Sequence, residues 1–169
     1  SHSSYQFQFL GVRDSSASEA TLAEVRLYDA AGTQLTVIEA LNPGGVPGNP
    51  AETARSVFDD DLSTKWVDVN FTTHALLQLF ITQPTYVAQY ELVTSTGAST
   101  SNLNRDPTSW LFGIRRETET ANGTVGLSFE VLSSVSGFDP PLARSTSYGR
   151  FYSILPPPPP GVPPPHLPP

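Results

Sequence analysis

Short stretches of alternating apolar and polar residues run through much of the chain. Aromatic side chains at 5, 7 and 9 alternate with glutamines, and apolar side chains at 125, 127, 129 and 131 alternate with small or polar ones. Val25 and Leu27 show the same period of two, set among Glu24, Arg26 and Tyr28. A period of two is typical of a strand with one buried face. We therefore expect a half-buried strand at each place.

Other stretches predict further strands, some of them buried on both faces. Residues 76–81 and 86–93 are almost wholly apolar, which favours central strands, and 148–154 is a last aromatic strand. Segments rich in Asn, Pro and Gly, such as 42–45 and 122–123, separate them as turns. Only 51–58 has room for a helix, of about two turns. About eight strands with long loops predict an all-β fold, a two-sheet β-sandwich or jelly roll.

Proline divides the chain into two parts, a body at 1–155 and a tail at 156–169. Ten of the 17 prolines lie in the last 15 residues. Such a run forms neither helix nor sheet and adopts polyproline II, reaching about 45 Å. Two interpretations stay open: a stiff linker, or a structural stalk whose prolines are hydroxylated and O-glycosylated. The candidates for modification are Pro156, Pro157, Pro158, Pro159, Pro160, Pro163, Pro164 and Pro165.

Composition excludes several classes of function. The net charge is −7 and the chain has one lysine, so no basic patch exists to bind nucleic acid or an anionic membrane. There is no cysteine, which excludes disulfides and thiolate chemistry. No apolar run approaches the roughly 20 residues that span a bilayer, so we expect a soluble protein.

Four motifs occur in an order that resembles a known superfamily. They are an Ala23-Glu24 pair in a strand, the acidic stretch SVFDDDLSTKW at 56–66, the strand YELVTS at 90–95, and RDPTSW at 105–110. This order resembles the coagulation-factor C-domain, discoidin and galactose-binding superfamily over roughly residues 5–155. The acidic and RDPxSW motifs are fairly specific together and weak alone. The resemblance implies a galactose-binding-like jelly-roll sandwich, usually with one structural calcium ion.

In that family, an Asp-x-Asp/Asn-x-x-Thr loop, a carbonyl three residues earlier and an Ala-Glu pair supply the calcium ligands. The positions that the resemblance implies here are Ser56, Asp59, Asp61, Thr64, Ala23 and Glu24. Calcium prefers six to eight hard oxygen ligands, and a cation would relieve the repulsion among three consecutive acids. The alternative is a turn in which the aspartates and the threonine only cap backbone groups. Asp60 stands where the family often has glycine, so it has to tolerate an unusual backbone conformation.

Other polar and aromatic residues offer weaker signals for a sugar site. Trp66 and Trp110 suit sugar stacking, but tryptophans in such motifs are more often core residues, and we favour the core. Arg105 and Asp106 are expected to form an ion pair with each other. Lectin members of the family bind galactose with a His, a basic residue, an Asn and an aromatic on loops. The candidates that this chain offers are His74, Arg105, Asn102 and Asn104, with Asn70 and Phe71 nearby, and no strict motif links them.

The chain has no recognisable catalytic motif, and two sequons favour secretion. The three histidines are scattered, and no HExxH, GxSxG or phosphate loop occurs, so we expect no enzymatic activity.

Asn70-Phe-Thr and Asn122-Gly-Thr are acceptors for N-glycosylation in predicted loops. The oligoproline tail resembles hydroxyproline-rich glycoproteins of green algae and plants, found in cell walls and flagellar hairs. An extracellular location follows as an expectation.

These observations lead to one preferred function and two alternatives. We expect a non-catalytic extracellular structural or assembly domain, whose sandwich contacts neighbouring protein subunits or glycans while the tail contributes to self-assembly. The first alternative is a calcium-stabilised carbohydrate-binding or adhesion module for galactose-type glycans. The second is a tail that binds an SH3 or WW domain, which we rank low because the tail has no flanking Arg or Lys.

Overall fold

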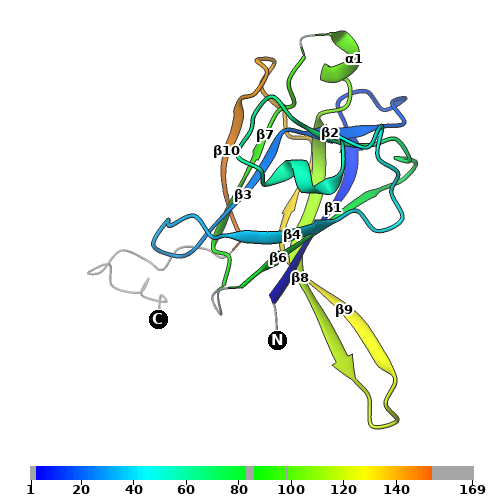
Figure 1. The fold of residues 1–169 in the computed structure, drawn as a ribbon, viewed down its shortest axis with the longest axis vertical. Helices are drawn as coiled ribbons and strands as arrows, with labels where there is room; N and C mark the ends of the chain where they lie inside the picture. The colour runs from blue at the N-terminus through cyan, green and yellow to red at the C-terminus, as the bar shows by residue number, and fades with distance from the viewer. Residues whose placement is uncertain (1–2, 83–85, 98, 154–169) are drawn as a thin grey trace, which may run out of the picture.

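Antiparallel β-strands make up nearly all of the regular structure (Figure 1). The computed structural model describes residues 3–82, 86–97 and 99–153. The strands are β1 (Ser3–Val12), β2 (Ala20–Leu22), β3 (Glu24–Tyr28), β4 (Val37–Leu41), β5 (Trp66–Asp68), β6 (Ala75–Ile81), β7 (Gln89–Val93), β8 (Pro107–Glu119), β9 (Val125–Val135) and β10 (Ser147–Tyr152). The helices are the single turns η1 (Ala54–Val57) and α1 (Thr100–Leu103). The expected all-β class is confirmed.

The strands form one large and two small sheets. The order is β4-β6-β1-β8-β9 in the five-stranded sheet, β10-β7-β3 in the three-stranded sheet and β2-β5 in the two-stranded sheet. As predicted, the apolar strands β6 and β7 have neighbours on both sides. Strand β7 begins at Gln89 rather than at Tyr86, and the helix expected over 51–58 is only the 3-10 turn η1.

Aromatic rings fill the space between the large sheet and the three-stranded sheet. Phe112 on β8 lies 4.6 Å, between ring centroids, from both Phe7 on β1 and Tyr90 on β7. Trp66 and Trp110 have no exposed surface, so the expectation that both belong to the core is confirmed. Because these rings join residues of opposed sheets, the arrangement is consistent with a β-sandwich.

Two alternating patterns predicted burial incompletely or on the wrong face. On β3 the apolar pair Val25 and Leu27 is buried as expected, but Glu24 and Tyr28 on the other face are buried as well, with 1% and 5% exposure. On β9 the apolar row faces solvent instead, with Val125 59% and Leu127 57% exposed. The register with β8 explains this. Ile114 of β8 faces the core and pairs with Glu130, so Glu130 lies on the same face of the sheet. The neighbouring apolar row at 125, 127, 129 and 131 therefore lies on the outer face.

The β8–β9 hairpin projects beyond the rest of the fold (Figure 1). We call its projecting part, residues 115–131, the β8–β9 arm. Strand β9 is the last strand of its sheet, so its second edge has no neighbour within the described part of the chain. The arm ends in a tight turn at Asn122-Gly123, where Gly123 has a φ of +73°, as the Asn-Gly pair predicts.

Asp106 is the centre of an ion cluster that joins three distant segments. It is fully buried and accepts hydrogen bonds from Arg144 at 2.6 and 2.9 Å and from Arg13 at 3.3 Å. Arg105 pairs with Glu19 instead, at 2.8 Å. The expected ion pair between Arg105 and Asp106 is therefore wrong: in the turn between α1 and β8 the two side chains have different partners, Glu19 for Arg105 and the arginines 13 and 144 for Asp106.

The last described residues are anchored to the three-stranded sheet. The Ser153 N–H donates to the Ala88 carbonyl at 3.0 Å, and its hydroxyl donates to the Val87 carbonyl. The predicted polyproline II tail, with all the prolines named above as sites of modification, lies outside the described residues. Within the described residues, no helix has the length and apolar character that crossing a bilayer requires.

Candidate functional site

Glu24 begins β3 and carries a buried carboxylate. It pairs in register with Val93 on β7, and the preceding Ala23 N–H donates to the Val93 carbonyl at 3.0 Å. The Glu24 side chain is 1% exposed, and its Oε1 is buried with no hydrogen-bond partner. Burying a carboxylate oxygen without a hydrogen-bond partner lowers the stability of the fold, so this oxygen is a candidate to bind a proton or a cation.

The acidic motif forms a tight turn between η1 and β5. The Asp61 N–H donates to Asp59 Oδ1 at 3.0 Å, and Thr64 Oγ1 donates to Asp59 Oδ2 at 2.7 Å. The Ser63 N–H and hydroxyl both donate to Asp61 Oδ1, at 2.8 and 2.6 Å. Asp60 has a φ of +59°, the unusual conformation expected where the family often has glycine. These contacts are those of the capping turn that was the alternative interpretation.

The fold brings Glu24 and this turn together. Burial first, and then the hydrogen bond and negative charge of Asp59, raise the pKa of Glu24 to about 7. The charge of Asp60 adds to this effect, and Arg26 opposes it only weakly. Two carboxylates that share so small a space fit either a shared proton or a divalent cation.

The predicted calcium ligands converge only in part. Glu24, Asp59 and Thr64 lie together, whereas Asp61 accepts hydrogen bonds from Ser63 at its Oδ1. The ligand predicted at Ser56 is its backbone carbonyl, and it stays a prediction. Among the described residues, no group of three His, Cys, Asp or Glu side chains converges as a metal site. The unpartnered Glu24 Oε1 beside Asp59 fits a calcium ion completed by hydroxyl and backbone oxygens, so calcium binding stays a prediction.

Comparison of the chain with known families, proteins and structures found no match. No family model matches the chain, and no curated protein or solved structure matches it either. The resemblance to the discoidin superfamily therefore stays a prediction that rests on the sequence motifs.

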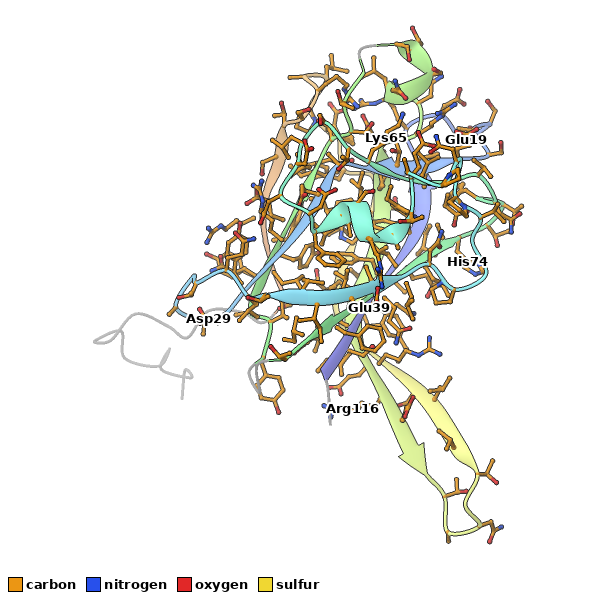
Figure 2. The ribbon with its side chains drawn as sticks, in the orientation of Figure 1. Glu19, Asp29, Glu39, Lys65, His74 and Arg116 are labelled. Atoms are coloured by element: carbon orange, nitrogen blue, oxygen red, sulfur yellow. The ribbon has the colours of Figure 1, made fainter. Side chains whose placement is uncertain are left out.

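The predicted sugar-binding residues do not form one site. Asn102 on α1 donates to Ser99 Oγ at 3.0 Å and accepts from Lys65 at 3.5 Å, while Arg105 pairs with Glu19. His74 lies on the loop before β6 and contacts Thr73, at 3.1 Å, and Asn104 contributes backbone hydrogen bonds. No hydrogen bond or ion pair in the described ranges joins His74 to the other three. Figure 2 labels Lys65 and His74 on their separate loops.

Both sequons lie at exposed positions. Asn122 is exposed at the tip of the β8–β9 arm, and Asn70 is exposed on the loop after β5. The side-chain amide of Asn70 donates to the Gly44 carbonyl at 3.2 Å, so a glycan there would replace this contact. The positions are accessible, and glycosylation stays a prediction.

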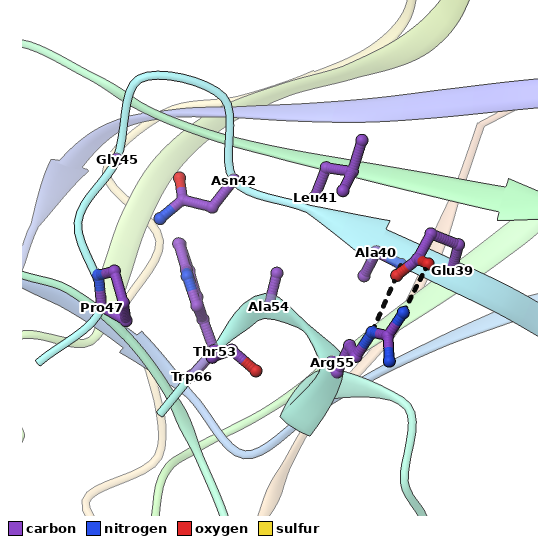
Figure 3. A pocket seen from close by; sticks show the side chains of 10 residues that line it. All are labelled: Glu39, Ala40, Leu41, Asn42, Gly45, Pro47, Thr53, Ala54, Arg55 and Trp66. Carbon is purple, nitrogen blue, oxygen red and sulfur yellow. Dashed lines mark hydrogen bonds and ion pairs between the residues drawn. The ribbon is translucent and has the colours of Figure 1, made fainter. Parts of the chain in front are cut away.

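A pocket that the sequence did not reveal lies between β4, η1 and the turn at 42–47 (Figure 3). Its volume is about 360 Å³. Glu39 and Arg55 form a two-pronged ion pair on one wall, at 2.8 and 3.1 Å. Trp66 lies at its floor, and both Trp66 Nε1 and Asn42 Oδ1 are buried without a hydrogen-bond partner. No local motif marks this pocket, because its residues come from three separate stretches of the chain, 39–47, 53–55 and Trp66.

Proposed function

We propose that the chain is a non-catalytic, calcium-stabilised extracellular domain of the jelly-roll type that assembles with further copies of itself through the β8–β9 arm. One observation carries the proposal: the apolar row of β9 faces solvent on a projecting edge strand. Val125, Leu127 and Val131 are 59%, 57% and 48% exposed there. Natural proteins usually protect such an edge with charges, proline or a covering segment, because it pairs readily with another strand.

The sequence of β9 is compatible with pairing to a second copy. Antiparallel pairing centred on Ser128 places Val125 opposite Val131 of the second copy and Leu127 opposite its Phe129. Glu130 then faces an uncharged residue and keeps its ion pair with Arg116, at 3.2 Å. An interface of this kind is symmetric and joins two five-stranded sheets edge to edge.

The tail of this chain is a poor partner for the same edge. Residues 156–160 and 163–165 are all proline, and proline has no N–H to donate to a sheet. A rod of polyproline II instead suits spacing or lateral association, because little conformational entropy remains to be lost. We propose this role for the tail in a cell wall, matrix or flagellar appendage.

The predicted calcium ligands and the two sequons are the features that favour an extracellular location. A cation between Glu24 and Asp59 would neutralise the paired carboxylates, and calcium is abundant outside cells. The residues that would hold it are Glu24, Asp59 and Thr64, with the carbonyls of Ala23 and Ser56 as the further ligands that the resemblance implies. Both sequons are accessible, which is compatible with passage through the secretory route.

Sedimentation velocity of the full chain over a range of concentrations tests assembly through the arm. We expect a dimer that the double substitution Leu127→Thr, Val131→Thr converts to a monomer. The matched control is Leu142→Thr, because Leu142 is 71% exposed but lies outside the arm. A wild-type chain that stays monomeric throughout, or a control that dissociates equally, rejects the arm as the interface.

Deletion of residues 156–169 tests the tail separately. We expect the dimer through the arm to persist and larger assemblies to be lost. Larger assemblies that persist without the tail would reject its role in assembly.

The second candidate function is a carbohydrate-binding module, and one observation favours it. The loops that were expected to hold the sugar do not converge on one site, but Trp66 Nε1 and Asn42 Oδ1 are unpartnered in the same pocket. A glycan array on the calcium-loaded chain tests this function, and a blank array rejects it.

A further inference from the structure

The outer face of the three-stranded sheet carries an aromatic row (Figure 1). Tyr28 on β3 and Tyr152 on β10 both pair in register with Gln89 on β7, so the three side chains lie on one face of the sheet. Phe151 points to the opposite face, where it stacks on the core residue Tyr90 with the ring centroids 5.4 Å apart. The Tyr28–Tyr152 row therefore faces away from the core, and Tyr152 is 51% exposed there.

Arg150 completes this surface. Its guanidinium lies over the Tyr28 ring, 3.8 Å from the ring centroid. Its Nη1 donates to Gln89 Oε1 at 3.3 Å, and its side chain is 44% exposed. We call the surface formed by Tyr28, Gln89, Arg150 and Tyr152 the β10 face. It presents a guanidinium stacked on one tyrosine at one side of Gln89, and a half-exposed tyrosine ring at the other.

The β10 face offers hydrogen-bond donors while its acceptors are occupied. Both oxygens of the neighbouring Glu91 carboxylate accept hydrogen bonds, one from Arg26 and one from Tyr28, each at 3.2 Å. Gln89 Oε1 accepts from Arg150, whereas Gln89 Nε2 meets no acceptor among the described residues. The ligand that suits such a face accepts hydrogen bonds and has none to donate.

We propose that the β10 face binds the proline tail, residues 156–169, of a second copy of this chain. The inference rests on the proposed role of the tail in assembly and names the surface that receives it. The contact joins two different surfaces, so it repeats from copy to copy and forms open assemblies. A weak contact suffices, because a dimer formed through the β8–β9 arm carries two tails and two β10 faces.

A run of prolines has the chemistry that this face requires. Each proline contributes a carbonyl acceptor and has no N–H, so the tail accepts hydrogen bonds along the run and donates none. The pyrrolidine rings form a regular apolar surface on a polyproline II helix, and aromatic side chains are the groups on which such helices dock. The amide donor of Gln89 and the ring of Tyr152 thus each meet a matching group.

The spacing of the β10 face matches the repeat of a polyproline II helix. Neighbouring strands lie about 4.8 Å apart, so Tyr28 and Tyr152, on either side of β7, are separated by about 10 Å. Polyproline II repeats every three residues, or about 9 Å. A helix that crosses the three strands therefore brings equivalent rings over both contact points, and the five prolines at 156–160 are enough for this.

The place of the tail in the chain favours a second copy over the same copy. Ser153 is held beside β7 by its hydrogen bonds to Val87 and Ala88. Only two residues separate it from Pro156, and the second of them, Leu155, precedes a proline, a position that favours extended backbone. A chain reversal takes about four residues, so the tail is not expected to turn back over its own sheet. A polyproline II segment of this length spans about 45 Å and reaches a neighbouring domain.

A labelled peptide tests the proposal on the full chain, made with unmodified prolines. The peptide has the sequence of residues 155–169, and fluorescence anisotropy measures its binding. We expect the anisotropy to rise saturably with the concentration of the chain. A peptide that does not bind saturably overturns the proposal. The dimer through the arm does not enter this measurement, so its absence would leave the result valid.

Three variants locate the binding on the β10 face. Tyr152→Ala removes the exposed ring, and Arg150→Ala removes the stacked guanidinium. Gln89→Glu keeps the acceptor for Arg150 but replaces the amide donor by a second acceptor. Each is expected to weaken binding at least about tenfold. Leu142→Ala and Arg116→Ala are the controls, because both residues are exposed outside this face. Circular dichroism checks the fold of every variant, and equal weakening by the controls overturns the site.

Sedimentation velocity separates this inference from the proposed function. We expect Tyr152→Ala and the deletion of residues 156–169 both to abolish assemblies larger than the dimer. If the deletion abolishes them and Tyr152→Ala does not, the tail acts through another surface, so its role in assembly holds and the β10 face is rejected. If the peptide binds but the deletion changes nothing, the face receives a proline-rich segment of another protein, and the second copy is rejected.

Discussion

At the scale of single residues, Glu24 makes the stability of the domain depend on pH between about 4.5 and 7. Burial and the neighbouring Asp59 raise its pKa from an ordinary value near 4.5 to about 7. The folded chain therefore holds this proton more tightly than the unfolded chain between pH 4.5 and 7. Stability is full below that window and is lost as the pH rises through it, because the ionised carboxylate is buried without a partner.

The substitution Glu24→Gln tests this effect in the presence of a chelator. At pH 8 in EDTA we expect Glu24→Gln to be more stable than wild type, by up to about 3 kcal/mol, and the two to be equal near pH 4.5. Calcium should restore the stability of the wild type at pH 8 and leave Glu24→Gln unchanged. Urea unfolding followed by circular dichroism measures these differences.

Glu130→Gln is the control for that experiment, since Glu130 is an exposed acid on the arm. It should follow the wild type at every pH, with and without calcium. If calcium stabilises Glu24→Gln as much as wild type, the ion does not bind at Glu24.

Single residues also show what the alternation of apolar and polar positions cannot predict. The period of two around Val25 indicates a strand correctly but assigns Glu24 to the solvent side. The family resemblance predicted that Glu24 lies near the acidic turn, and in the structure Glu24 does lie beside Asp59. Trp66 was expected in the core and lies there, but the absence of a hydrogen-bond partner for its N–H among the described residues is a property of the packing around it, which no local pattern predicts.

At the scale of elements, the β8–β9 hairpin depends on Gly113. A Cβ at this position would lie 2.0 Å from the Glu130 carbonyl oxygen and 3.0 Å from the Phe129 ring. The glycine thus lets β9 approach β8 closely at the bulge, where the ladder shifts register between Phe112 and Gly113.

We expect Gly113→Ala to lower the free energy of unfolding by about 2 kcal/mol, because the added methyl group forces the two strands apart. Gly11→Ala is the control: it is also on a strand of this sheet, but its nearest contact would be at 3.4 Å. Urea unfolding of both variants measures the difference. Equal stability of the two variants would contradict the tight approach.

The elements differ in how well the sequence predicts them. Strands β1 and β6 carry strong apolar patterns and were expected close to their observed positions, whereas the strand expected over 86–93 begins only at Gln89. Strands β2 and β5 have three residues each, too few for any periodicity to be recognised. The outward apolar face of β9 was missed because a period of two does not say which face meets the core, and only pairing with β8 decides it.

At the scale of the whole molecule, Asp106 joins the end of β1, the start of β8 and the segment before β10. We expect Asp106→Ala to destabilise the domain by about 3–5 kcal/mol, since it leaves Arg13 and Arg144 without their buried partner. Asp139→Ala is the control, because Asp139 pairs with the same Arg13 but is 94% exposed. Its cost should stay below about 1 kcal/mol. Thermal and urea unfolding check both values, and similar losses would contradict a central role for Asp106.

The anchoring of Ser153 has a mechanical consequence. A pulling force applied to the residues after Ser153 acts first on the two hydrogen bonds of Ser153. These bonds join Ser153 to Val87 and Ala88, the two residues directly before β7. The force then acts on the pairing between β10 and β7. We therefore expect the three-stranded sheet to separate before the five-stranded sheet. Tension applied at this end is therefore expected to disrupt the three-stranded sheet first, at a distance from the β8–β9 arm, which belongs to the other sheet.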